Sequence, residues 1–502
     1  MAKTATPPDL TLTGSRPGTT RFQWLCDEVR SAILDGRLKR GTRLPSTREL
    51  SRRYGVSRGT VVSAFEELHS EGYLEGKVGA GTYVNALLPE DLLHPQPDPG
   101  RETRTRRARP ALSRFARRLG PVPDLRGQPA RAFRAGEPAL DAFPLAVWAQ
   151  IASRRLRRAT RTLLADGDSR GYRPLREAVA DYLGAARGVR CNADQVIIVS
   201  GIQQGLDLTA RLTLDPGDAV WVEDPCYFGV PAMLRALQAR IVAVSIDRYG
   251  PNVRDARRRC ADAKLAYVTP AHQFPLGPAM ALDRRLALLD WARQTGGLIF
   301  EDDYDSEYRY SGRPIPAIQG LDQSGSVIFS GSFGKVLLPS LRLGYLVVPL
   351  ELVDKFAAAR FVIDRFSSVI DQAMMCDFLT EGHFGRHIRR MRELYASRLA
   401  ILRDAVDRKL AGLLHLQDTE AGVQTVGWLG EGLSAADVAD AAAAESVEVI
   451  PINRFAIRAR LPEGLLLGFA AVDAREIIRG VDRLARVLER CTRRSWGGPP
   501  GP

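Results

Sequence analysis

The stretch "SGSFGKVLLPSLRLGY" at residues 330–345 carries one lysine, Lys335, on a turn of small residues between two apolar segments. No other charged residue occurs in it before Arg342. Burial among apolar residues lowers the pKa of an amine, and a neutral amine can attack a carbonyl carbon. The stretch therefore predicts a reactive lysine at the end of a buried strand.

The surrounding sequence alternates short apolar runs with amphipathic helices from about residue 131 onwards. Continuous β-branched runs separated by helices such as 201–212 and 284–294 predict a largely parallel sheet that is covered on both faces. After Phe366, a long helical stretch, weaker strands and a last amphipathic helix (475–491) predict a smaller α+β lobe. The predicted strands are 195–200, 219–224, 240–246, 265–270, 297–303, 326–332 and 342–348.

Length and composition limit the class of protein. A chain of 502 residues is long enough for two or more domains, and 71 Lys+Arg against 58 Asp+Glu favours a polyanionic partner such as nucleic acid. The six cysteines show no metal-ligand spacing, so we expect no metal site and no disulfide framework. The start of the chain lacks a signal-peptide pattern and no run approaches about 18 apolar residues, so we expect a cytoplasmic protein without a membrane partner.

Proline and arginine mark the expected domain borders. We expect a first domain at 18–86, a Pro/Arg-rich linker at 87–130, the α/β domain with its lobe at 131–490, and a disordered tail at 491–502. The linker contains a basic run that is either a solvated segment or an auxiliary contact to DNA phosphates. The run consists of Arg101, Arg104, Arg106, Arg107 and Arg109.

The first domain has the pattern of a winged helix-turn-helix, an α+β fold. Apolar residues at helical spacing predict a first helix that ends by Gly36, and Ser46 and Ser57 can cap two further helices joined by a turn at Gly55. The segment "GYLEGKVGAGTYV" (72–84) then predicts two short strands around a glycine-containing loop. The whole predicts a reader of double-stranded DNA.

The start of the third helix enters the major groove in this geometry, and the wing and the preceding turn meet the backbone. For any single arginine here, a solvated surface position is the alternative. The motifs "GTRLPSTRELSRRYGVSRGTV" (41–61) and "EGYLEGKVGAGTYV" (71–84) resemble the GntR-type winged helix-turn-helix, which implies most of the same contacts. The candidate DNA contacts are Arg43, Arg48, Arg58, Gly59, Thr60, Lys77 and Gly79.

Three further features would have to meet at Lys335 if that lysine binds pyridoxal phosphate. The acidic cluster after "LIF" includes Asp302, which could keep a pyridine nitrogen protonated; a solvated acidic loop is the alternative. The strand-to-helix turn in "IIVSGIQQGLDL" (197–208) directs backbone amides at an anion, and Arg342 supplies a cation for a phosphate. Tyr227 could cover one face of the ring.

Several motifs resemble the fold-type I aminotransferases and, more closely, the MocR/GabR-type regulators, in which a GntR reader is fused to an aminotransferase-like domain. The resemblance implies a homodimer, with Lys335 as the Schiff-base lysine. The motifs are "SRGYRPLREAVADYL" (169–183), "DPGDAVWVEDPCY" (215–227), "YVTPAHQFPLG" (267–277), "EDDYDSEYRY" (301–310) and "GSFGKVLLPSLRLGYLVVP" (331–349). The other roles it implies are the pyridine nitrogen partner for Asp302, a donor to the ring oxygen for Tyr304, ring stacking for Tyr227, phosphate contacts for Gly201, Ile202 and Arg342, and a place beside the ring for His272.

The sequence also departs from that family. Asp166 stands where relatives usually have a tyrosine that reaches the neighbouring subunit's phosphate, and Gly334 stands where they usually have serine. Leu466 and Leu467 precede "GFA" where an arginine often binds a substrate carboxylate. Arg454, Arg458 and Arg460 are the candidates for a replacement.

The sequence thus predicts a transcriptional regulator, not an enzyme, that binds an operator and uses pyridoxal phosphate to sense the cofactor itself or an amino compound. Two alternatives remain at this point. One is an active pyridoxal phosphate-dependent aminotransferase with a DNA-binding appendage, and the other is a regulator whose sensor domain has lost the cofactor. The sequence does not specify the effector, the operator, or activation against repression.

Overall fold

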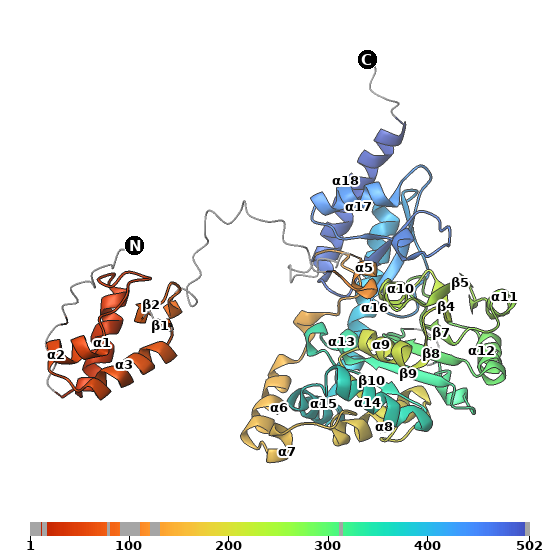
Figure 1. Cartoon of the computed structure of the whole chain (residues 1–502). Coiled ribbons are helices and arrows are strands. Elements are labelled where there is room, and N and C mark those ends of the chain that lie inside the picture. The colour runs from red at the N-terminus through yellow and green to blue at the C-terminus, as the bar shows by residue number, and fades with distance from the viewer. Residues whose placement is uncertain are drawn as a thin grey trace. The chain divides into compact units, whose positions relative to one another are not determined.

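The computed structural model describes residues 12, 18–77, 81–90, 111–120, 131–310 and 315–496 (Figure 1). Contacts divide the chain into two compact units, Met1–Pro110 and Ala111–Pro502. That division falls inside the predicted linker, whose basic run at 101–109 lies outside the described residues.

The first unit is a winged helix-turn-helix, as predicted. Ser57 caps the third helix, where the Thr60 amide donates to Ser57 Oγ at 3.0 Å, and Gly55 ends the second helix at a φ of 64°. Leu25, Val29 and Ile33 are buried in its core. Its elements are α1 (Arg21–Leu34), α2 (Thr47–Tyr54), α3 (Arg58–Ser70), β1 (Leu74–Lys77) and β2 (Gly81–Val84).

A third segment extends the wing at its edge. The Leu44 amide donates to the Thr82 carbonyl at 2.8 Å, and the Val84 amide donates to the Thr42 carbonyl at 2.9 Å. Arg43 pairs with Tyr83 in an isolated bridge, so the chain ahead of α2 lies against β2. This pairing places Arg43 on the wing, although its sequence position is before the helix-turn-helix.

The second unit is built on a sheet that has eight strands among the described residues. Its order is β3-β10-β9-β8-β7-β4-β5-β6, and all neighbouring pairs from β9 to β5 are parallel. Strand β10 is antiparallel to both of its neighbours, and β6 is antiparallel to β5. The strands are β3 (Val196–Val199), β4 (Ala219–Asp224), β5 (Arg240–Asp247), β6 (Gly250–Pro251), β7 (Leu265–Val268), β8 (Leu298–Asp303), β9 (Val327–Ser332) and β10 (Gly344–Val347).

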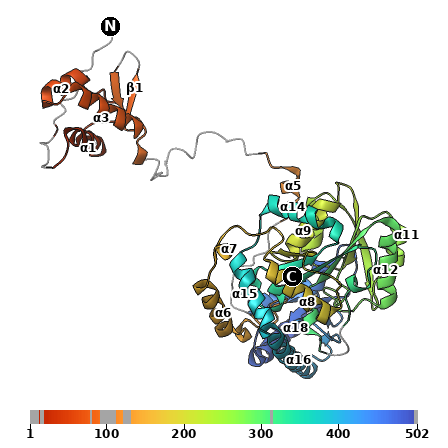
Figure 2. The same cartoon turned by 90° about the horizontal axis from the view of Figure 1, so that it is seen from below.

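Helices cover both faces of this sheet, because alternate residues of each strand point to opposite sides (Figure 2). Ile197 and Val199 pack with α9 and α14, whereas Val196 and Ile198 pack on the opposite face, where α8 lies. The helices of this domain are α6 (Leu145–Arg157), α7 (Arg161–Leu164), α8 (Arg173–Arg187), α9 (Ile202–Thr213), α10 (Gly229–Ala236), α11 (Val253–Arg259), α12 (Leu282–Thr295), α13 (Phe333–Val336), α14 (Val353–Ile363) and α15 (Val369–Thr380).

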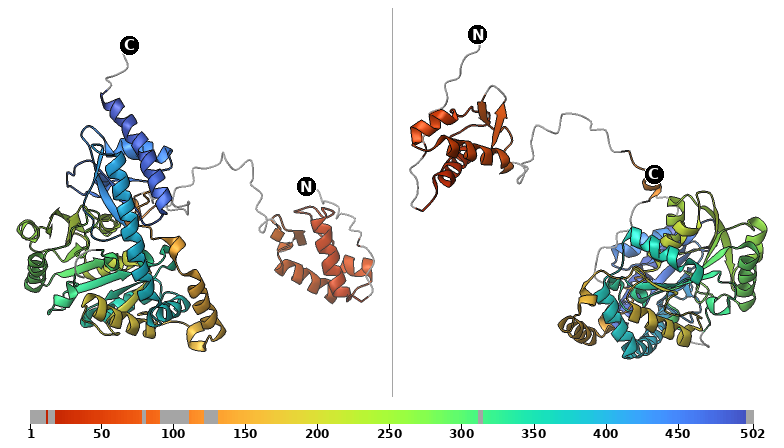
Figure 3. Two further views of the ribbon diagram at one scale, coloured as in Figure 1. Left: turned by 180° about the vertical axis from the view of Figure 1, so that it is seen from behind. Right: turned by 60° about the horizontal axis from the view of Figure 1, so that its bottom comes forward.

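The smaller lobe is an antiparallel sheet of order β11-β12-β14-β13 packed against helices. The long helix α16 leads from the large domain into this lobe, as Figure 3 shows from behind. Gly468 is required here, because a Cβ at this position would lie 1.8 Å from the Arg134 carbonyl oxygen. The elements are α16 (His383–Lys409), β11 (Leu414–Leu416), β12 (Gln424–Leu429), α17 (Ala435–Ala444), β13 (Ile450–Pro451), β14 (Gly464–Gly468) and α18 (Ala474–Trp496).

One expectation about the end of the chain needs correction. The tail does not begin at 491: α18 continues to Trp496, because Cys491 extends the apolar stripe of Leu484 and Leu488 onto the core. The predicted linker also contains a short helix, α5 (Arg114–Arg118), capped by Ser113 and packed against α10. In the described part of the chain, no helix is long and apolar enough to cross a membrane.

Candidate functional sites

A cavity of about 260 Å³ opens at the carboxyl ends of the parallel strands, where α/β domains commonly bind ligands. All the residues predicted to bind a cofactor line it except His272, which lies directly behind Tyr304. The lining residues predicted from the sequence are Lys335, Asp302, Tyr304, Tyr227, Gly201, Ile202 and Arg342.

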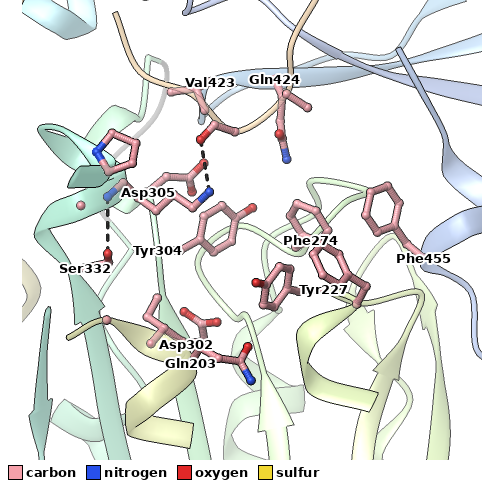
Figure 4. Close-up of a pocket in the computed structure, with 18 of the residues that line it drawn as sticks. Gln203, Tyr227, Phe274, Asp302, Tyr304, Asp305, Ser332, Val423, Gln424 and Phe455 are labelled. Carbon is pink, nitrogen blue, oxygen red and sulfur yellow. Dashed lines mark hydrogen bonds between the residues drawn. The ribbon is translucent and has the colours of Figure 1, made fainter. Parts of the chain in front are cut away.

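Lys335 lies on α13, the single turn of helix that follows β9. Its backbone amide donates to Ser332 Oγ at 3.4 Å, and its Nζ donates to the Gly136 carbonyl oxygen at 3.2 Å (Figure 4). The side chain is accessible from the cavity, but the protein surrounds the cavity closely enough for desolvation to lower the pKa of the amine. The lysine is therefore placed and tuned to react with a carbonyl group in the cavity.

Asp302 at the end of β8 has one satisfied and one unsatisfied carboxylate oxygen. Its Oδ2 accepts a hydrogen bond from the Tyr267 hydroxyl at 2.5 Å, whereas its buried Oδ1 has no partner among the described residues. Burial raises the pKa of Asp302 to about 7, against the hydrogen bond from Tyr267, which lowers it. A buried acceptor without a partner costs about 1–3 kcal/mol, so Oδ1 is suited to a donor supplied by a ligand.

Tyr304 reaches the cavity from the residue after β8. Its hydroxyl lies 3.1 Å from His272 Nδ1, which is also 3.0 Å from Asp305 Oδ1. A ring nitrogen carries either one hydrogen or one lone pair. When His272 Nδ1–H donates to Asp305, Nδ1 cannot accept the Tyr304 hydroxyl proton, so that proton is available to a group in the cavity. Burial raises the pKa of Tyr304 well above its usual value, so the phenol remains a donor.

The amino terminus of α9 and Arg342 together form a cradle for an anion. Gly201 precedes α9 with a φ of 129°, and Arg342 Nη1 lies 3.9 Å from the place where a Gly201 Cβ would be. Arg342 is exposed and has no ion-pair partner among the residues that the structure describes. Free backbone amides at a helix start and an unpaired guanidinium are the groups that bind phosphate.

Aromatic side chains form one wall of the cavity. Tyr227 and Phe274 meet edge to face with ring centroids 6.1 Å apart (Figure 4). Such a wall can stack against a planar ring. The sequence did not predict Phe274, Tyr267 or Gln424 as pocket residues. Tyr267 could have been found, because β7 and β8 are neighbours and their carboxyl ends meet.

The described candidates for DNA contact lie at the start of α2, at the start of α3 and on the wing. Arg43, Arg48, Arg58 and Gly59 are exposed, and a Cβ on Gly59 would meet only Ser57 Oγ, at 3.7 Å. Nothing inside the protein therefore requires glycine there.

Two further predicted contacts have partners within the protein, and one cannot be placed. Lys77 forms an ion pair with Glu75 at 3.0 Å and lies over the Tyr83 ring, while the Thr60 hydroxyl lies 2.8 Å from Ser57 Oγ. Gly79 lies outside the described residues.

Comparison with known proteins identifies the same two domains that the structure shows. The model of the bacterial regulatory proteins of the gntR family matches residues 23–84, and the model of aminotransferase class I and II matches residues 132–484. The probable rhizopine catabolism regulatory protein MocR of Rhizobium meliloti is 39% identical over 461 residues, which are 92% of this chain and 92% of that protein. The chain belongs to the MocR-type transcriptional regulators.

Solved aminotransferase structures resemble the second part of this MocR-type chain. The Pyrococcus horikoshii kynurenine aminotransferase, solved in complex with PMP, is 28% identical with a TM-score of 0.66 and covers 71% of this chain and 90% of its own. LysN, the α-aminoadipate aminotransferase of Thermus thermophilus, complexed with N-(5'-phosphopyridoxyl)-L-leucine, is 29% identical with a TM-score of 0.66, covering 72% of this chain and 92% of its own. The predicted fold-type I domain is confirmed.

The family departures have different structural settings in this MocR-type chain. Asp166 is exposed, lies outside the cavity and forms an ion pair with Arg365 at 2.9 Å. At Gly334 a Cβ would make only ordinary contacts, the nearest with Ser332 Oγ at 3.7 Å, so a serine would fit. Leu466 is 1% exposed and lines the cavity.

The expected replacement for the carboxylate-binding arginine is not found in the cavity. All three candidates are exposed, and none belongs to the lining. The backbone of the loop that carries them is held by the large domain, because the amides of residues 457–459 donate to the Asp224 carboxylate at 2.7–2.8 Å. The candidates were Arg454, Arg458 and Arg460.

Proposed function

We propose that this MocR-type regulator holds pyridoxal phosphate on Lys335 and that the occupant of the cavity controls the binding of an operator by the reader at residues 18–86. One observation carries the proposal: the unpartnered, buried Asp302 Oδ1 lies in the same cavity as an amine of lowered pKa and an unpaired Arg342. These groups match the ring nitrogen, the carbonyl carbon and the phosphate of this cofactor.

Each residue then has a defined task. Bound pyridoxal phosphate supplies an electrophilic carbonyl carbon and a ring that withdraws electrons when its nitrogen is protonated. Asp302 would hold that proton on the ring nitrogen, and Lys335 would supply the amine for covalent attachment. The Tyr304 hydroxyl, positioned by His272, would donate to the ring oxygen. Tyr227 would stack on the ring, and Gly201, Ile202 and Arg342 would bind the phosphate.

The DNA-binding part is proposed from the geometry of α3 and the wing. Arg58, Gly59 and Thr60 would approach base edges, and Arg43 and Arg48 would neutralise phosphates. Lys77 and Gly79 would let the backbone of the wing approach the minor groove. A homodimer in the cytoplasm would present two readers and so require two half-sites in the operator. Exposed leucines on α6 and α7, at positions 145, 156 and 164, support an interface between copies.

We further infer that ligand binding in the cavity serves as a regulatory signal and that the cavity does not convert bound ligands into products efficiently. The alignment with MocR covers 92% of this chain and therefore reaches into the reader as well as the aminotransferase-like domain, which supports a regulatory role. Leu466 in place of a carboxylate-binding arginine argues against efficient binding of the usual α-amino acid substrates of aminotransferases. A slow half-reaction on a bound amine remains chemically open.

The test is an absorbance spectrum of the purified full chain with added pyridoxal phosphate, followed by borohydride reduction and peptide mapping. We expect a band near the visible edge and a reduced adduct on Lys335. Lys335→Ala should lose both, whereas Lys355→Ala, which removes an exposed lysine of α14, should keep both. An adduct that maps to another lysine, or its persistence in Lys335→Ala, would overturn the assignment.

A further inference from the structure

The side of the cavity that faces the smaller lobe is apolar. Val423, Ile450, Phe455 and Leu466 all line it, and Phe274 lies against Phe455 with ring centroids 5.1 Å apart. Figure 4 shows Val423, Gln424 and Phe455 across the cavity from Asp302. A ligand that extends from the cofactor towards this lobe therefore meets hydrocarbon.

The described residues give the cavity few cations. Among the described lining residues, Lys335 and Arg342 are the only cations, and the proposed function assigns both to the cofactor. Asp305, which also lines the cavity, adds a negative charge there. With the cofactor bound, the described lining residues would leave a carboxylate of the effector buried without a counter-ion, and such burial is strongly unfavourable.

Gln424 supplies the only neutral amide at this apolar side that the described residues provide. Its side chain is buried, with 5% of the residue's surface exposed, and its Oε1 has no hydrogen-bond partner within the described part of the chain. An uncharged polar group of a ligand, or its N–H, could satisfy this amide, whereas the amide carries no charge to offset a carboxylate.

We propose that the effector of this regulator is a small primary amine with an apolar body and no carboxylate. The inference rests on the proposed function, because it takes Lys335 and Arg342 as occupied by the cofactor. The size limit comes from the cavity of about 260 Å³, which is below the usual range of about 300–1,000 Å³ for small-molecule sites and must also hold the cofactor.

The amine must be primary because it replaces Lys335 on the cofactor. The incoming nitrogen forms a new C–N double bond to the cofactor's carbonyl-derived carbon while the bond from that carbon to Lys335 Nζ breaks. Both protons of the incoming amine pass to Nζ, and Lys335 leaves as a free amine, so no oxidant or reductant is needed. The released Nζ can remain close to the Gly136 carbonyl oxygen, to which it donates at 3.2 Å.

The experiment compares amines with the amino acids that differ from them only by the carboxylate. The full chain loaded with pyridoxal phosphate is titrated with 3-methylbutylamine and leucine, and with 2-phenylethylamine and phenylalanine. Binding is followed by the absorbance of the cofactor and by the thermal unfolding midpoint. We expect each amine to bind at least about tenfold more tightly than its amino acid, a difference of about 1.4 kcal/mol. Equal affinity, or a preference for the amino acids, would overturn the inference.

The second part of the experiment repeats these titrations with variants that add a positive charge to the apolar side of the cavity. Leu466→Arg should shift the ratio of the two affinities by about tenfold or more towards the amino acid. Ile450→Arg tests the same point at a half-buried site, because Ile450 pairs with Leu466 between β13 and β14. Leu282→Arg, at an exposed leucine of α12 outside the cavity, is the matched control and should leave the ratio unchanged.

The two proposals fail in different ways. If no borohydride-stable adduct forms on Lys335, the proposed function is wrong and this inference falls with it. If the adduct forms normally but Leu466→Arg and Ile450→Arg both fold and leave the amine preference unchanged, the cofactor assignment stands and the account of carboxylate exclusion is wrong.

Discussion

Replacing Asp302 by asparagine removes the charge that we assign to the pyridine nitrogen while keeping nearly the same volume. A hydrogen bond to a charged group contributes about 1.5–3 kcal/mol, so Asp302→Asn should weaken the binding of pyridoxal phosphate by about one to two orders of magnitude at pH 8. The Tyr267 hydroxyl can still donate to the amide oxygen, so the side chain should keep its position.

The weakening of pyridoxal phosphate binding by Asp302→Asn should depend on pH, and the burial of Asp302 determines the direction of this dependence. Its pKa is raised to about 7 in the free protein, so the carboxylate is ionised above that pH and protonated below it. Below pH 7, the ratio of the dissociation constant of Asp302→Asn to that of the wild type should therefore fall by up to about tenfold per pH unit. The ratio of the two dissociation constants should be large at pH 8 to 9 and approach one near pH 5.5.

The assay is an equilibrium titration of both proteins with pyridoxal phosphate, followed by absorbance, from pH 5.5 to 9. The ratio is the informative quantity, because the titrations of the cofactor's phosphate and of Lys335 are common to both proteins. A ratio near one at pH 8, or a large ratio that does not change with pH, would refute the pairing of Asp302 with the ring nitrogen.

Two further changes test the reader and the packing behind the cavity. Arg58→Ala should weaken binding to an operator selected from random DNA by about 1–3 kcal/mol in a titration, with little change on a random duplex; equal losses on both would make Arg58 a phosphate contact. Arg187→Ala should lower the free energy of unfolding by about 3–5 kcal/mol in chemical denaturation, because it leaves buried Asp303 without the guanidinium that lies 2.7 Å away. Arg173→Ala on the same helix breaks only exposed pairs, with Glu177 and Asp194, and should change the denaturation midpoint little. A similar loss in both variants would contradict the role of burial.

Much of the fold could be predicted because local patterns decide it. The strands of the large sheet are continuous β-branched runs, and each predicted strand lies within two residues of an observed one. The order of the strands could not be predicted, since β10 inserts antiparallel between β3 and β9 through contacts that are far apart in the sequence. The edge pairing of residues 41–44 with β2 depends in the same way on tertiary contacts.

The residues of the site also divide into those that local sequence patterns predict and those that only tertiary contacts bring to the cavity. Lys335, Asp302 and Arg342 were predictable because they follow or precede neighbouring strands, whose ends meet at one edge of the sheet. Gln424 belongs to the other lobe, and no local pattern relates it to Lys335. The position of the three candidate arginines outside the cavity lining also depends on tertiary contacts, because Asp224 of β4 fixes the backbone of residues 457–459.

The bonds to Asp224 also bear on how an aminotransferase-like pocket can serve a regulator. They join the large domain to the smaller lobe directly beside the cavity, whose opposite sides carry Asp302 and Gln424. A ligand changes an equilibrium between two arrangements only by binding one of them more tightly. An effector that touches only the cofactor side would bind both arrangements alike, whereas one that also fills the apolar side binds best when the two lobes close on it. If the effector is the amine without a carboxylate that we propose, that difference would come from its apolar contacts with Leu466 and Ile450, which line the cavity from the smaller lobe.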